Sequence, residues 1–107
     1  MNIETIEISG KILIGGILGD IYIKDYNNVG RLSFSYIIEK IRKLADIKYV
    51  EYYISSAMFL PSAILDDLLI VAPVDSLESK LYDNFGGYIY LRIHYISKTG
   101  NKITLDE

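Results

Sequence analysis

The chain lacks cysteine and tryptophan altogether, and it has a single histidine and only two prolines. Without cysteine it has no disulfide framework, no thiolate metal ligand and no cysteine nucleophile. No apolar run approaches the roughly 18 residues that a membrane-spanning helix needs. The first residues, Met1 to Glu4, lack the basic and then apolar pattern of a signal peptide. We therefore expect a cytoplasmic protein without a membrane segment.

Apolar side chains, in contrast, are abundant. They make up 50% of the 107 residues, and the formal net charge is −3. This length predicts a single domain, residues 1–107, with a real hydrophobic core. A monomer of this size has difficulty burying so much apolar surface, which favours self-association. The acidic balance repels phosphate backbones and argues against nucleic acid as the partner.

The strongest strand pattern in the chain covers residues 88–96. Side chains alternate between the two faces of a strand. One face of this strand carries Ile89, Leu91, Ile93 and Tyr95. The other face carries Tyr88, Tyr90, Arg92 and His94. The first set predicts a core face, and the second predicts an aromatic and basic face whose covering is the main functional question.

Helical patterns precede and follow the middle of the chain. Residues 33–45 place apolar side chains on one stripe at helical spacing, and Ser33 is a suitable N-cap. A second helix is predicted after Asp75, which forms a capping box with Glu78, and it ends at Gly86. Residues 55–65 favour no single structure, and within them residues 57–60 could form a core plug or a second contact site.

The remaining patterns predict strands. Residues 3–8 and 11–14 form an N-terminal hairpin around Ser9 and Gly10, and residues 20–24 and 47–54 are further strands. The segment from Leu68 to Ala72 is apolar on both faces, which predicts a central strand. Residues 102–105 predict a short C-terminal strand.

From about residue 20 the predicted order is β-α-β-β-α-β. This order is similar to the ferredoxin-like, or split βαβ, two-layer sandwich of the α+β class. Such a fold leaves one face of the sheet free of helices. The alternative is a profilin- or longin-like α/β sandwich, which is favoured if residues 3–24 form consecutive strands of the main sheet.

The helix-free face of the predicted sheet is the candidate interface. It would collect Tyr22, Tyr49, Tyr53, Tyr88, Tyr90 and Arg92. Tyrosine and arginine are enriched at the centres of interfaces, and symmetric dimers are the commonest assemblies. The sequence therefore predicts a non-catalytic binding or regulatory module that forms a homodimer or binds a protein partner. In a monomer the N-terminal hairpin would have to cover this face.

Two other functions compete with this interpretation. Tyrosines on an open sheet can stack bases, with Arg92 and Lys24 meeting the phosphates of a single-stranded nucleic acid. A metal-dependent phosphodiesterase or nuclease would use Asp66 as a ligand and His94 as a general acid or base. Because Asp66 and Asp67 are adjacent on a predicted strand, they point to opposite faces and make a poor metal pair. We expect no metal ion and no cofactor.

Overall fold

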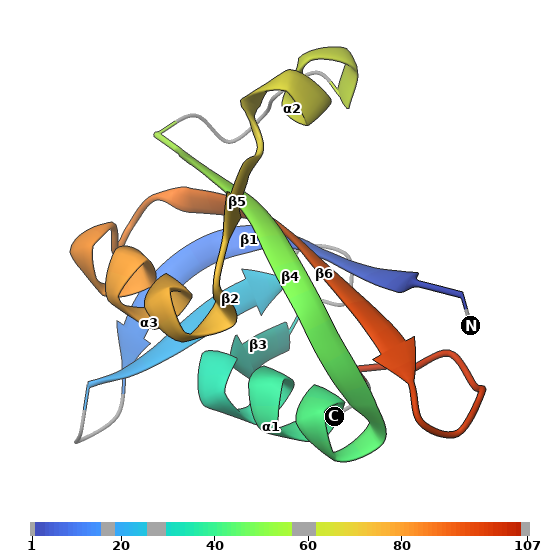
Figure 1. Cartoon of the computed structure of the whole chain (residues 1–107). Coiled ribbons are helices and arrows are strands. Elements are labelled where there is room, and N and C mark those ends of the chain that lie inside the picture. Colours follow the sequence, from blue (N-terminus) through green and yellow to red (C-terminus); the bar gives the residue numbers. More distant parts are fainter. Residues whose placement is uncertain (1, 16–18, 26–29, 57–61, 106–107) are drawn as a thin grey trace.

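A computed structural model describes residues 2–15, 19–25, 30–56 and 62–105, with the backbone alone for residues 62 and 63. These residues form six strands and three helices. Their bounds are β1 Glu4–Gly15, β2 Asp20–Asp25, β3 Gly30–Ser33, α1 Phe34–Leu44, β4 Ala45–Ser55, α2 Ser62–Leu68, β5 Ile70–Ala72, α3 Val74–Asp83 and β6 Tyr88–Ser97. The strands build one curved antiparallel sheet in the order β3-β2-β1-β6-β4-β5 (Figure 1).

The core lies between the sheet and the helices α1 and α3. We call the face of the sheet toward these helices the inner face and the opposite one the outer face. Ile89, Leu91, Ile93 and Tyr95 of β6 are completely buried on the inner face, as their alternation predicts. The apolar stripe of α1 is buried against the same face, and Ser33 caps this helix by accepting a hydrogen bond from the backbone N–H of Tyr36.

The predicted N-terminal hairpin is wrong. Residues 4–15 form one continuous strand, β1, whose first part pairs with β6 and whose second part pairs with β2. The partners overlap at Gly10 and Lys11, where strands flank β1 on both sides. A Cβ atom on Gly10 would lie 1.8 Å from the carbonyl oxygen of Lys24. The glycine therefore permits a close approach between neighbouring strands and does not make a turn.

The prediction of a central strand from Leu68 to Ala72 is also wrong. Leu68 ends α2, and the strand β5 contains only Ile70–Ala72, at the edge of the sheet. Ile70 is 53% exposed and Val71 is 63% exposed. The run is apolar throughout because Leu68 ends α2 and Leu69 directly follows it on the outer face, whereas its β-branched residues, Ile70 and Val71, form an exposed edge.

The fold is a small α+β domain with an antiparallel sheet, but the ferredoxin-like topology is not confirmed. The two central strands are β1 and β6, and the strand order is unusual for that fold. Because β1 and β2 are consecutive strands of the main sheet, the condition for the profilin- or longin-like alternative is met, and that alternative stays a prediction.

The C-terminal segment differs from its prediction as well, because residues 102–105 form no strand. Ile103 is instead buried in the core, and its backbone N–H donates a hydrogen bond to the hydroxyl of Tyr95 over 2.9 Å. The side chain of Ile103 is therefore buried in the core although its segment forms no strand of the sheet.

Candidate functional site

The outer face of the sheet gathers the residues that the sequence singled out. Antiparallel partners share a face, and Tyr49 lies opposite His94, while Tyr53 lies opposite Tyr90. Arg92 lies between these two pairs, opposite Glu51 of β4 on one side and Glu7 of β1 on the other. Tyr88 follows on the same face of β6. Tyr22 also occupies an outer-face position, but on β2, separated from β6 by β1.

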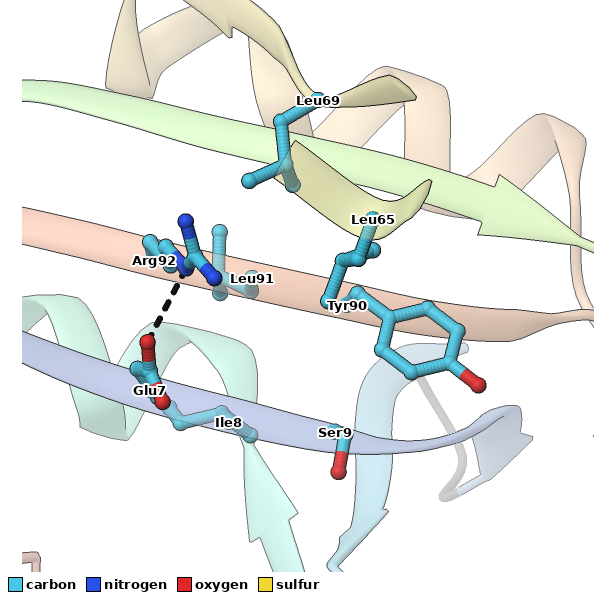
Figure 2. Close-up of a pocket in the computed structure, with 8 residues that line it drawn as sticks. All are labelled: Glu7, Ile8, Ser9, Leu65, Leu69, Tyr90, Leu91 and Arg92. Atoms are coloured by element: carbon cyan, nitrogen blue, oxygen red, sulfur yellow. Dashed lines mark ion pairs between the residues drawn. The ribbon is translucent and has the colours of Figure 1, made fainter. Parts of the chain in front are cut away.

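The helix α2 covers the centre of the outer face. Leu65 and Leu69 lie over Tyr90 and Arg92, and together they line a cavity of about 170 Å³ (Figure 2). The other lining residues are Glu7, Ile8, Ser9 and Leu91. The chain itself therefore provides part of the covering that the sequence assigned to a second subunit or to an N-terminal hairpin.

The sequence analysis missed α2. Residues 57–61, just before it, lie outside the described part of the chain. Leu65, Leu68 and Leu69 stand at positions i, i+3 and i+4, which is the spacing of one helical face. This signal was available, but a seven-residue helix offers too few positions to separate it from the apolar strand pattern of the same leucines.

Arg92 joins three elements through its ion pairs. Its Nη1 atom lies 2.6 Å from Oδ1 of Asp66 on α2, and its Nε atom lies 2.9 Å from Oε1 of Glu7 on β1. The hydrogen bond with Asp66 raises the pKa of Arg92; burial opposes this, and the nearby charges of Asp66, Glu7 and Glu51 add to it. An arginine held by carboxylates in this way is poorly placed to contact a phosphate, and Asp66 is poorly placed to bind a metal.

His94 is held from both sides of its ring. Its Nε2 atom lies 2.6 Å from Oε1 of Glu51, and its Nδ1 atom lies 3.0 Å from the hydroxyl oxygen of Thr5. The ring also stacks on Tyr49, with centroids 4.4 Å apart and an angle of 24° between the planes. A general acid or base must exchange a proton with substrate. His94 would have to break one of these hydrogen bonds to do so.

The described residues contain no group of three or more histidine, aspartate or glutamate side chains that could hold a metal ion. None of the helices in the same part of the chain is long and apolar enough to cross a membrane. Comparisons with family models, with curated proteins and with solved structures find no match for this chain.

Proposed function

We propose that the chain is a non-catalytic binding module that acts as a homodimer, in which two copies join at the outer edge of β5. The observation that supports this proposal is the exposure of Ile70 and Val71 on an edge to which no described strand pairs. An exposed, uncharged strand edge is a template for pairing with another chain. A second copy supplies the same edge.

The two edges of the sheet differ in their protection. The other edge strand, β3, carries the exposed Arg31, and charged side chains are a common means of preventing edge pairing. The residues of β5 are Ile70, Val71 and Ala72, none of which is charged. The edge of β5 is therefore the better candidate for contact between copies.

Antiparallel pairing of β5 with its symmetry mate has a defined geometry. The two-fold axis stands perpendicular to the sheet, so the outer faces of both copies look the same way and form one continuous surface. Stable interfaces bury about 1,200–2,000 Å², which is more than three paired residues provide. We include α2 in the contact, because it directly precedes β5 and its Ile64 is also exposed.

The oligomeric state tests this proposal. We expect light scattering on a sizing column to give about twice the chain mass of 12.2 kDa for the wild type. Val71→Lys should reduce the mass to that of one chain, since a charge at the edge opposes pairing. Phe85→Lys is the matched control: Phe85 is 67% exposed and follows α3. This change should leave the dimer intact.

Two outcomes would overturn the proposal. A wild-type protein that runs as a single chain at every concentration excludes the homodimer. A dimer that survives Val71→Lys but dissociates on Tyr53→Glu places the contact on the tyrosines of the outer face, as the sequence predicted. Tyr90→Glu is less informative, because it would disturb both a contact between copies on the outer face and the packing of α2 on Tyr90.

A further inference from the structure

Three cations form a row on the outer face, away from α2. Lys11 of β1 lies directly opposite Lys24 of β2, and Lys24 lies directly opposite Arg31 of β3. Because neighbouring strands are about 4.8 Å apart, these three side chains start within about 10 Å of one another. The three cations, with Leu13 and Gly30, line a shallow hollow on this face. We call Lys11, Lys24 and Arg31 the basic row.

A tyrosine ring accompanies the basic row at each end. The guanidinium of Arg31 lies over the ring of Tyr22, 5.8 Å from its centroid. The ammonium of Lys11 lies over the ring of Tyr88, 5.9 Å from its centroid, and Tyr88 is the residue opposite Lys11 on β6. The three cations thus lie side by side on β1, β2 and β3, with the ring of Tyr88 beyond Lys11 on β6 and the ring of Tyr22 beside Arg31.

The acidic side chains of the outer face stand away from the basic row along the strands, with Asp20 four residues before Lys24 on β2. Glu7, Glu51 and Asp66 surround Arg92. Glu7 is four residues before Lys11 on β1, which corresponds to about 13 Å along a strand. Like charges directly opposite each other on neighbouring strands destabilise a sheet. A chain of net charge −3 that nevertheless keeps three cations side by side has a local surface suited to an anionic ligand.

We propose that the basic row and its two tyrosines bind single-stranded nucleic acid. Lys11, Lys24 and Arg31 contact successive phosphates, and unstacked bases lie on the rings of Tyr22 and Tyr88. A basic track with aromatic rings is the combination that binds single strands without sequence preference. Rings on a sheet surface cannot reach the stacked bases of a duplex. An acidic peptide would need the cations but not the rings.

This inference is independent of the homodimer. The basic row lies on β1, β2 and β3, whereas β5 is at the opposite edge of the sheet. It also differs from the sequence-based expectation, which assigned phosphate contacts to Arg92 and Lys24. The net negative charge of the chain repels phosphates, but at about 0.1 M salt charges more than about 10 Å away are largely screened, so the cations of the basic row act more strongly on a ligand bound beside them.

Fluorescence anisotropy with a labelled oligothymidine of about 16 nucleotides tests the inference, since this length matches the upper site sizes of such proteins. Three phosphate contacts predict a slope of about −2 for log affinity against log salt concentration. Lys24→Glu should weaken binding at least tenfold and make the slope less steep. Tyr88→Ala should weaken binding about fivefold or more, with the slope unchanged.

The control is Lys80→Glu, which makes the same change in net charge on α3, on the inner side of the sheet (Figure 1). It should leave the affinity unchanged. The inference is overturned if the wild type does not bind at low salt, if Lys80→Glu weakens binding as much as Lys24→Glu, or if a duplex binds as tightly as the single strand. Repeating the titration with Val71→Lys separates this test from that of the homodimer.

Discussion

Arg92 of β6 and Asp66 of α2 form an ion pair whose two atoms are 2.6 Å apart. Since Arg92 also pairs with Glu7 of β1, one side chain connects the helix on the outer face to the two central strands of the sheet. The apolar part of the contact comes from Leu65 and Leu69 (Figure 2). In the described part of the chain, the ion pair of Asp66 and the contacts of Leu65 and Leu69 thus attach α2 to the outer face.

Asp66→Asn should weaken the contact of α2 with the sheet without unfolding the sheet. The carboxylate of Asp66 is 68% exposed, and exposed pairs contribute about 0.2–1 kcal/mol, so the free energy of unfolding should fall by about 1 kcal/mol at most. Hydrogen exchange of the amides of α2 should become several-fold faster. Asp67→Asn is the matched control, because the described residues provide no ion-pair partner for Asp67, and it should leave exchange unchanged. Equal acceleration by both variants would contradict the prediction.

The raised pKa of Arg92 leads to a prediction about pH. For a base whose pKa is higher in the folded state, the stabilisation is complete below the unfolded pKa and is lost as pH rises through the folded pKa. For an arginine both values lie far above neutral pH. Arg92→Gln should therefore lower the free energy of unfolding by the same amount at about pH 7.5 and about pH 9. Denaturant titrations at both pH values check this, and a loss that shrinks at the higher pH would contradict it.

Gly10→Ala should be strongly destabilising. Its new Cβ atom would meet the backbone carbonyl of Lys24, which cannot move without separating β1 from β2. We expect a loss of about 3 kcal/mol or more, as for severe overpacking in a core, measured from the denaturant midpoint. Gly15→Ala is the control on the same strand, because its nearest contact would be the Tyr22 ring at 3.5 Å. It should change stability by less than about 1 kcal/mol.

The contrast between these glycines explains which parts of the fold the sequence could predict. The stripe of α1 and the alternation of β6 depend on local periodicity and were confirmed. Gly10 follows a serine, as in many turns, but its role is set by Lys24, which becomes a neighbour only in the folded sheet. The positions of β5 and α2 depend likewise on packing across the sheet and not on local pattern.

The candidate sites show the same division. Alternation alone predicts that Tyr88, Tyr90, Arg92 and His94 of β6 share one face, and they do. The carboxylates that hold Arg92 come from β1 and α2, and no local pattern connects them. The basic row is a further example, because Lys11, Lys24 and Arg31 become neighbours only through the registers of β1, β2 and β3.

The two hydrogen-bond partners of His94 determine which of its ring nitrogens carries a hydrogen. A carboxylate oxygen accepts hydrogen bonds, so the contact with Glu51 requires the hydrogen on Nε2. In the neutral ring Nδ1 then accepts a hydrogen bond from the hydroxyl of Thr5. Because the side chain is only 13% exposed, the Nε2–H proton should exchange slowly with water and give its own NMR signal.

Substitution separates the roles of the two partners. Glu51→Leu removes the acceptor, and the Nε2–H signal should broaden or disappear. Thr5→Val removes only the donor to Nδ1, and the signal should remain. An Nδ1–H tautomer in the wild type would contradict the arrangement. A persistent Nε2–H signal means that His94 keeps its proton in a bond to Glu51, which favours a structural role for this side chain over that of a general acid or base.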